Sequence, residues 1–572
     1  MTSAMTSEMT GDTTGAMSGA MTVGPAQARV RAAYRRNAEA DRPEIWIDLR
    51  PQAETEAEAA AIDRRTAAGE ALPLAGTVLA VKGNIDVAGL PTTAGCPGYA
   101  YRPAEDAVAV ARLRAAGAVV LGTTNLDQFA TGLVGTRSPY GAVRNALDPA
   151  RVSGGSSSGS AVAVALGIAD LALGTDTAGS GRVPAAFNGI VGLKPTYAAV
   201  PTTGVVPACR SLDCVSVFAR TVAEAEQAHA LLLDAPPAPP ARRPGPWRIA
   251  VPTLAQLGEL DPGWAEAWTT AAQRLADAGA QLRPLDLSPF DRTAELLYQG
   301  AFVAERYTAV GAFLDKHAAS PEDAGIDPVV AAIITAARDL PAHQLFADQA
   351  ELDRLRRAAL AELGDADALL LPTAPGCPTL EAVAADPVGT NTRLGRFTNS
   401  TNLLGLCALA VPAGPPFGVM LIGRPHTEAA LGALARLLEA APPVRLAVVG
   451  AHLSGQPLNH QLLALGARLA AVTATAPEYR LYALPTSPPK PGLVRVAEGG
   501  ASVDAEVWEL PAAGLGRLLA GLPAPMALGS VRLADGSTVP GFLCEPAALR
   551  PDPPDITPYG GWRAYLAAQP QH

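Results

Sequence analysis

Two glycine- and serine-rich segments carry the densest chemical signal in the sequence. They are Gly154–Ser160 (GGSSSGS) and Gly174–Pro184 (GTDTAGSGRVP). Glycines this close together let backbone N–H groups converge on one point, which makes a nest for an anion. A phosphate loop would need Gly-Lys-Ser/Thr after the glycines, and a dinucleotide fingerprint would need GxGxxG after a strand; neither is present here. The anion that remains is a developing oxyanion, with a serine hydroxyl beside it as nucleophile.

A serine nucleophile needs a base, and the sequence offers a lysine for that role. None of the seven histidines falls between Lys82 and Ser180, although a histidine distant in sequence stays open because such sites assemble in space. Lys82 ends the apolar run Gly76–Val81, where burial would lower its pKa toward that of a usable base. Two alternatives without a catalytic role stay open. Lys82 could be a lysine at a strand end in solvent, and the serine-glycine segment could be a flexible linker.

The elements around these residues predict an α/β fold. Short apolar runs alternate with helical segments from Leu74 onward, and several later apolar runs read as buried strands. The expected helices are 26–38, 53–69, 107–116, 161–166 and much of 264–360, and the expected strands are 76–82, 119–122, 369–372, 408–412 and 446–450.

Length and composition bound the protein class. A chain of 572 residues with 49% hydrophobic and 17% charged residues predicts at least two globular domains. We expect a disordered leader over residues 1–24, a first domain over 25–442 and a second over 443–572. The net charge of −10 argues against a nucleic-acid partner. The longest apolar stretch, Ala161–Thr175, contains Asp170 and is too short to span a bilayer, so no membrane association is expected.

The cysteines and the first residues indicate the compartment. Six dispersed cysteines without a CxxC pair predict free, mostly buried thiols in a reducing environment, with no disulfide framework and no metal site. The first 23 residues lack the basic start and the continuous apolar stretch of a signal peptide. A cytoplasmic location follows as the expectation.

A resemblance to a known family adds to this picture. Residues Gly154–Thr196 resemble the signature region of the amidase signature family, and the similarity runs from Leu74 to about residue 440. The resemblance implies a mixed central sheet covered by helices and a hydrolase that cleaves an amide C–N bond without a cofactor. It implies that Lys82, Ser156 and Ser180 are catalytic, that the peptide bond before Ser156 is cis, and that Ser180 is the nucleophile. It also implies that the oxyanion is held by the N–H groups of Thr177, Ala178, Gly179 and Ser180. Gly83 departs from the family's usual aspartate at that position.

Within this family the sequence is similar to allophanate hydrolases. Asp127–Gly141 and the phrase GTDTAGSGR carry this similarity, together with Tyr298 and Arg306. The last two lie eight residues apart on one expected helix, about two turns along the same face. The resemblance implies that they hold the carboxylate of allophanate (urea-1-carboxylate), a group that arginine binds bidentately. The alternative for Arg306 is a surface salt-bridge residue, since Glu305 is its neighbour.

The C-terminal segment resembles the allophanate hydrolase C-terminal domain. Residues 446–566 carry GAHLSGQPLN, YRLYALP and DITPYGGWRAYL, and imply a β-rich domain similar to the γ-glutamyl cyclotransferase fold. The resemblance implies that this domain helps to decarboxylate N-carboxycarbamate, so that the products are ammonia and CO₂. We expect His452, Asn459 and Arg563 in its pocket. For His452, capping or packing beneath a loop is an equal alternative.

Other functions stay open at this point. Another amidase, acting on biuret, indoleacetamide or glutamine, would not need Arg306 and would prefer neutral amides. A subunit of a tRNA-dependent amidotransferase is disfavoured by the acidic charge. The tail could instead be an assembly scaffold. The resemblance further implies a homodimer, and association with urea carboxylase or with enzymes of cyanuric acid degradation is an expectation of the same kind.

Overall fold

A computed structural model describes residues 24–235, 245–414, 416–439, 443–549 and 553–569. The chain forms two compact units, residues 1–439 and 440–572. Apart from Gly24, the leader predicted over residues 1–24 lies outside the described residues. Among the described helices, none combines the length and the apolar character that crossing a membrane requires. All six cysteines are free and buried, as predicted.

The first unit is built on one mixed sheet of 11 strands, in the order β1-β3-β2-β4-β6-β5-β10-β11-β9-β7-β8. Strands β2, β3 and β4 run parallel, and antiparallel neighbours surround β6, β5, β10 and β11. The strands are β1 (Trp46–Leu49), β2 (Val78–Lys82), β3 (Val119–Thr124), β4 (Leu171–Asp176), β5 (Val191–Lys194), β6 (Cys214–Ala219), β7 (Arg248–Val251), β8 (Gln281–Pro284), β9 (Ala368–Pro372), β10 (Cys407–Pro412) and β11 (Gly418–Gly423).

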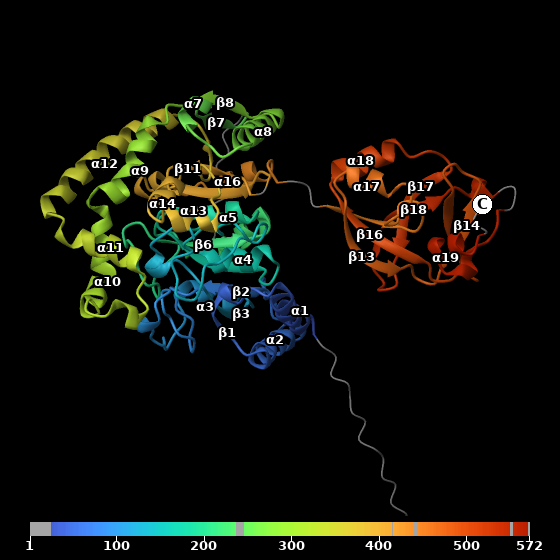
Figure 1. Ribbon diagram of the computed structural model, residues 1–572, viewed down its shortest axis with the longest axis horizontal. Helices are drawn as coiled ribbons and strands as arrows, with labels where there is room; N and C mark the ends of the chain where they lie inside the picture. Colours follow the sequence, from blue (N-terminus) through green and yellow to red (C-terminus); the bar gives the residue numbers. More distant parts are fainter. Residues whose placement is uncertain (1–23, 236–244, 415, 440–442, 550–552, 570–572) are drawn as a thin grey trace, which may run out of the picture. The chain divides into compact units, whose positions relative to one another are not determined.

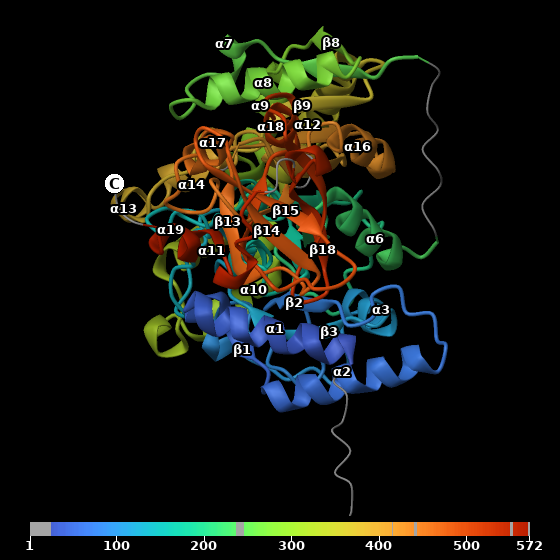
Figure 2. The same ribbon diagram turned by 90° about the vertical axis from the view of Figure 1, so that its right-hand side faces the viewer.

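Helices cover both ends and the faces of this sheet (Figures 1 and 2). Helices α1 and α2 pack together beside the β1–β3 end, and α8 lies at the opposite end, against β8 and β9. The helices are α1 (Pro25–Ala40), α2 (Gln52–Ala67), α3 (Val108–Ala115), α4 (Ser158–Ala165), α5 (Val183–Phe187), α6 (Val222–Leu232), α7 (Leu254–Leu257), α8 (Trp264–Asp277), α9 (Ser288–Gln299), α10 (Ala304–Lys316), α11 (Pro328–Ala336), α12 (Ala342–Leu363), α13 (Leu380–Ala385), α14 (Gly389–Leu394), α15 (Asn399–Leu403) and α16 (Glu428–Ala435).

The central strands are buried along their whole length. In β2 (VLAVK) and β4 (LALGTD) every residue is buried, including the polar ends Lys82 and Asp176. Such continuous apolar runs form strands that are covered on both faces, and only polar groups with hydrogen-bond partners can end them at low cost. The predicted α/β fold is therefore confirmed, and the sheet delivers two charged side chains to its buried interior.

One predicted element is wrong in detail. The segment 264–360 is mostly helical, but β8 interrupts it, and the single helix expected for Tyr298 and Arg306 is two helices. Helix α9 ends at Gln299, because the extended backbone of Gly300 and a short 3₁₀ turn (Ala301–Val303) precede α10.

The second unit is β-rich, as predicted. A five-stranded sheet in the order β13-β16-β12-β18-β17 is joined by the hairpin β14-β15, and the core includes Tyr479, Trp508 and Trp562. Its elements are β12 (Val444–Val448), α17 (Asn459–Ala464), β13 (Arg468–Ala474), β14 (Tyr479–Leu484), β15 (Lys490–Arg495), β16 (Asp504–Leu510), α18 (Ala512–Ala520), β17 (Met526–Arg532), β18 (Thr538–Cys544) and α19 (Trp562–Ala567).

Candidate active site

Lys82 lies at the buried end of β2 and is fully enclosed. Its Nζ donates hydrogen bonds to Ser156 Oγ and to Thr175 Oγ1, both at 2.7 Å. Burial lowers the pKa of Lys82 to about 7, although the Asp127 and Asp176 carboxylates act in the opposite direction. The reading of Lys82 as a lysine in solvent is wrong, since the residue has no exposed surface. A lysine with this pKa is neutral in a large fraction of molecules at neutral pH, and can accept a proton.

Ser156 follows a non-proline cis peptide bond, between Gly155 and Ser156, just before α4. The backbone here has no room for a side chain, because a Cβ on Gly155 would lie 2.0 Å from Oδ2 of Asp127. The Ser156 carbonyl accepts a hydrogen bond from the Asp127 N–H at 3.1 Å. The serine hydroxyl is thus held against Lys82 by a closely packed backbone.

Ser180 lies in the loop between β4 and α5, which an ion pair braces. The Asp176 carboxylate accepts hydrogen bonds from the N–H groups of Gly179 and Gly181 and pairs with Arg182 at 2.9 Å. Both partners are fully buried, and the guanidinium outweighs the effect of burial and holds the pKa of Asp176 below its usual range. Within the described part of the chain, Ser180 Oγ has no hydrogen-bond partner. The structure therefore contains the Lys82–Ser156 bond but not a bond from Ser156 to Ser180.

The predicted oxyanion donors differ in their availability. The Gly179 N–H points to Oδ1 of Asp176 at 2.9 Å and is already used, so the expectation for this group needs correction. The N–H groups of Thr177, Ala178 and Ser180 have no such partner among the described residues. The reason for the difference is the brace itself, because the Asp176 carboxylate lies against the loop that it supports.

Arg306 is a buried cation that forms no ion pair among the described residues, although the Asp213 carboxylate favours its charge from a longer distance. Only 2% of its surface is exposed, and no aspartate or glutamate among the described residues forms an ion pair with it. Its Nη1 donates to Thr131 Oγ1 at 2.8 Å and to the Ala130 carbonyl at 3.3 Å, and its Nη2 donates to the Tyr298 hydroxyl at 3.0 Å. The alternative that Arg306 forms a surface salt bridge is wrong, since the neighbouring Glu305 instead accepts a hydrogen bond from the Ser211 hydroxyl. The two predicted residues meet although they lie on different helices.

Comparison with known family models matches both units of the chain. A model of the amidase family matches residues 29–431, and a model of the allophanate hydrolase C-terminal domain matches residues 444–567. The chain belongs to the amidase family. Both resemblances noted in the sequence are thereby confirmed.

Individual relatives of this amidase are similar over most of its length. Urea amidolyase of Saccharomyces cerevisiae is 41% identical over 549 residues, which are 87% of this chain and 30% of the yeast protein. The chain thus spans about 30% of the length of the curated urea amidolyases that it matches. The structure of Kluyveromyces lactis allophanate hydrolase is 39% identical with a TM-score of 0.66, and covers 95% of this chain and 97% of that one. The 2-amino-5-chloromuconic acid deaminase of Comamonas testosteroni is 37% identical over 67% of this chain and 85% of that protein.

Several residues of the amidase site were not foreseen from the sequence. Thr175 is the second acceptor of Lys82, and its hydroxyl also accepts from Asn84 at 3.3 Å. Asp213 accepts from the Thr177 hydroxyl at 2.5 Å, and Thr131 accepts from Arg306. Thr175 is the penultimate residue of β4, so its buried position was a usable signal, whereas Asp213 and Thr131 come from distant loops. A Cβ at Gly83 would lie 3.0 Å from the Thr124 carbonyl oxygen and 2.7 Å from Ile47 Cδ1, a side-chain end that can move, so a larger residue here would need a small local shift.

The predicted residues of the second unit have different roles. His452 lines a cavity of about 200 Å³ together with Lys490 and Gln461, and its ring stacks on Phe542 at 4.8 Å. Burial lowers the pKa of His452, which favours the neutral form of the ring. Asn459 and Arg563 are not among the residues that line this cavity, and their place in a pocket of this domain stays a prediction. Asn459 donates to the His452 carbonyl at 2.9 Å, and Arg563 pairs with Glu506 at 2.7 Å, so both hold the loop in place.

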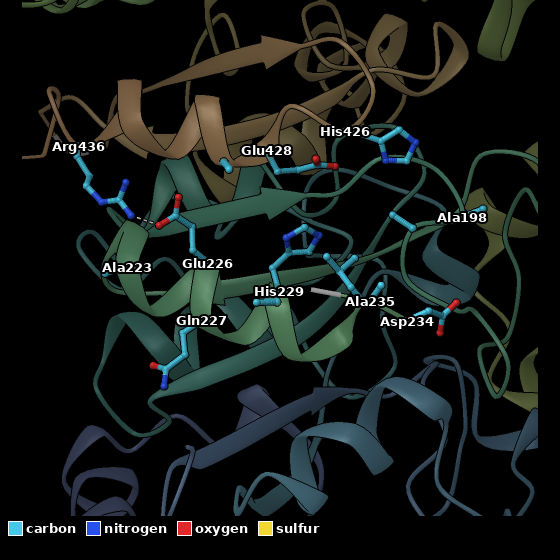
Figure 3. Close-up of a pocket in the computed structure, with 14 residues that line it drawn as sticks. Ala198, Ala223, Glu226, Gln227, His229, Asp234, Ala235, His426, Glu428 and Arg436 are labelled. Carbon is cyan, nitrogen blue, oxygen red and sulfur yellow. Dashed lines mark hydrogen bonds and ion pairs between the residues drawn. The ribbon is translucent and has the colours of Figure 1, made fainter. Parts of the chain in front are cut away.

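A cavity with a larger volume than the one beside His452 lies away from Lys82, Ser156 and Ser180. It measures about 800 Å³, is lined by residues of α6 and α16, and contains His229, Glu428 and the Glu226–Arg436 ion pair (Figure 3). Among the described residues, its lining contains none of the predicted catalytic residues and no serine, cysteine or lysine that could act as a nucleophile. Size alone therefore does not mark the active site of this amidase. A smaller cavity of about 410 Å³ is lined by Tyr298 and Asn399, beside the Ser180 loop and Arg306.

Proposed function

We propose that the amidase unit hydrolyses allophanate, with Ser180 as nucleophile and Ser156 and Lys82 as its proton relay. The observation that carries the substrate is Arg306, a buried cation that forms no direct ion pair among the described residues. An unpaired charge in a protein interior is costly, so an anion from outside the chain is the expected partner. The relationship to allophanate hydrolase of Kluyveromyces lactis supports the same substrate.

The proposed reaction starts with the Lys82–Ser156 hydrogen bond. Neutral Lys82 accepts the proton of Ser156 while Ser156 accepts that of Ser180, and Ser180 Oγ forms a bond to the carbonyl carbon of the terminal amide. The free N–H groups of Thr177, Ala178 and Ser180 stabilise the oxyanion, and the loop brace by Asp176 keeps them in position. The relay returns a proton to the nitrogen, the C–N bond breaks, and ammonia leaves an acyl-enzyme. Water then attacks the acyl carbon by the same relay and releases N-carboxycarbamate.

The carboxylate would bind beside Tyr298 and Arg306. Two acceptors already orient Nη1 of Arg306, and its Nε has no partner among the described residues, so donor capacity remains for an anion. The Tyr298 hydroxyl adds a hydrogen-bonding group on the Nη2 side. A neutral amide would leave the guanidinium unpaired, and this argues for a substrate with a negative charge over biuret or indoleacetamide.

Replacement of Arg306 by alanine tests the substrate class. We expect kcat/KM for allophanate to fall roughly 30-fold to 10³-fold, which corresponds to a loss of about 2–4 kcal/mol of transition-state stabilisation. The reason is that a desolvated charge pair is lost. Propionamide, which has no carboxylate, should lose far less. The measurement is ammonia release with each substrate, and Arg338→Ala is the matched control, since that arginine is more than half exposed. Equal turnover of allophanate by wild type and variant would overturn the substrate assignment and leave the amidase chemistry in place.

The rate of this amidase should depend on pH through Lys82. The working form of the relay is neutral, so the rate should be constant well above the pKa of about 7 and should fall about tenfold per pH unit well below it. The sign follows from burial, which lowers the pKa and so favours loss of the proton. Measurement of kcat/KM with the charge-free propionamide between pH 5.5 and 9 checks this. A profile without a fall near pH 7 would exclude Lys82 as the base.

For the second unit we propose assistance in the decarboxylation of N-carboxycarbamate, with His452 and Lys490 in its cavity as anion-binding groups. The positions of His452 and Lys490 in the lining of this cavity support this proposal. A tail that serves mainly in assembly is the second candidate.

We further propose a cytoplasmic homodimer that works beside an enzyme supplying allophanate, either a urea carboxylase or an enzyme of cyanuric acid degradation.

A further inference from the structure

Residues 127–131 connect the two halves of the active site. At one end, the Asp127 N–H donates to the Ser156 carbonyl at 3.1 Å. At the other end, the Ala130 carbonyl and the Thr131 hydroxyl accept from Nη1 of Arg306. We propose that this segment is a spacer that sets the distance between Ser156 of the proposed proton relay and the substrate carboxylate, and that Thr131 is the residue that positions Arg306. The proposal rests on the proposed carboxylate-binding function of Arg306.

The Asp127 end of the spacer is fixed to the catalytic backbone. The Asp127 carboxylate accepts N–H groups of Val134, Gly135 and Arg137 at 3.0–3.2 Å and has no exposed surface. The Gly155 N–H, which belongs to the residue before the cis bond, donates to the Leu133 carbonyl at 2.8 Å. A shift of this segment would therefore move the Ser156 backbone with it.

The other end of the spacer is fixed to the helix that carries Arg306. Phe129 packs edge-to-face on Phe313 of α10 with ring centroids 5.9 Å apart, and its N–H donates to the Ala94 carbonyl at 2.8 Å. The Thr131 hydroxyl donates to the Phe129 carbonyl at 3.2 Å, which leaves its oxygen lone pairs free to accept from Arg306. This second bond fixes the orientation of the hydroxyl.

The backbone of the spacer is strained at its centre. Phe129 and Ala130 both have left-handed backbone angles, with φ of 51° and 53°. Residues with side chains adopt this conformation at an energetic cost, and such costs are concentrated at functional sites. Here the two left-handed residues turn the Ala130 carbonyl and the Thr131 hydroxyl toward the same guanidinium nitrogen. The strain thus has a local result, which is the fixed position of Nη1.

A fixed spacer predicts selection by substrate length. Allophanate and malonamate have one atom between the amide carbon and the carboxylate, and succinamate has two. If the site is built for allophanate, a guanidinium held by Thr131 pairs best with the shorter acids. The longer acid, once paired with the cation, would carry its amide carbon past the position suited to attack. Loss of the Thr131 hydroxyl should weaken this selection.

The test compares Thr131→Val with Thr131→Ser in the full chain. Malonamate, succinamate and propionamide are the substrates, and ammonia release is measured. For Thr131→Val we expect kcat/KM with malonamate to fall about 10- to 100-fold, mainly through KM, and the preference for malonamate over succinamate to shrink by a similar factor. The loss with propionamide should be at least tenfold smaller. Thr131→Ser, which keeps the hydroxyl, should restore most of the malonamate rate.

Two controls separate the possible failures. Thr373→Val removes another buried hydroxyl that has no partner among the described residues, and should leave the substrate preference unchanged. If Arg306→Ala lowers malonamate turnover and Thr131→Val does not, the spacer proposal is wrong and the carboxylate site stands. Equal losses on malonamate and propionamide would also overturn it, since they would show a merely structural role. If Arg306→Ala has no effect on malonamate, both proposals fail together.

Discussion

Replacement of Ser180 by alanine is expected to lower ammonia release from allophanate by about 10⁵- to 10⁶-fold. The reason is that no acyl-enzyme can form without the Ser180 hydroxyl, and loss of a serine nucleophile removes nearly all catalysis beyond binding and oxyanion stabilisation. The fold should persist, because Ser180 Oγ has no hydrogen-bond partner among the described residues whose loss would destabilise it. The measurement is ammonia release over hours at pH 8, with unfolding followed by circular dichroism.

Ser158→Ala is the matched control for this result. Ser158 is also fully buried, two residues after Ser156, and its hydroxyl donates to the Asn125 carbonyl at 3.3 Å. Its loss should cost about 1 kcal/mol of stability and leave the rate within a few-fold of wild type. The mechanism would have to be abandoned if Ser180→Ala kept more than about 1% of the wild-type rate.

Local patterns in the sequence were sufficient to predict the elements that carry Lys82 and Ser156. The strand that ends in Lys82 and the helix after Ser156 follow from an apolar run and a glycine-serine turn, which are signals within a few residues. The apolar strand before Lys82 suggested burial but left a lysine in solvent as an equal alternative, and the structure shows that Lys82 is buried. The cis bond before Ser156 came from the family resemblance and not from the residue types, since serine and glycine alone do not predict it.

Contacts between distant segments could not be predicted in the same way. The spacing of Tyr298 and Arg306 suggested one helix, yet the chain breaks at Gly300 and the two side chains meet through tertiary packing. Thr131 reaches Arg306 across 175 residues of sequence, and no local pattern encodes such a pair. The hydrogen bond from the Gly179 N–H to Asp176 could not be predicted either. A motif gives the order of residues, but it does not say which acceptor each N–H group binds.

Replacement of Lys82 by methionine should lower kcat/KM by about 10²- to 10⁴-fold, the range in which a positioned base acts. Methionine is close to lysine in length and fits an apolar strand, so the change removes the base with little change in packing. The residual rate should also lose its fall near pH 7, because no group with that pKa remains in the relay. The measurement is the pH profile of kcat/KM for wild type and variant.

Lys194→Met separates the role of a base from the role of a buried amine. Lys194 is likewise fully buried, and its Nζ donates to the carbonyls of Pro195 and Leu406 at 2.8 Å, without contact to a serine hydroxyl. Its loss leaves two buried carbonyls without a donor and should destabilise the fold by about 1–3 kcal/mol. The fall in rate near pH 7 should nevertheless persist in this variant. If both variants kept that fall, the titrating group would be a residue other than Lys82, and the lysine would serve only to hold Ser156 and Thr175 in place.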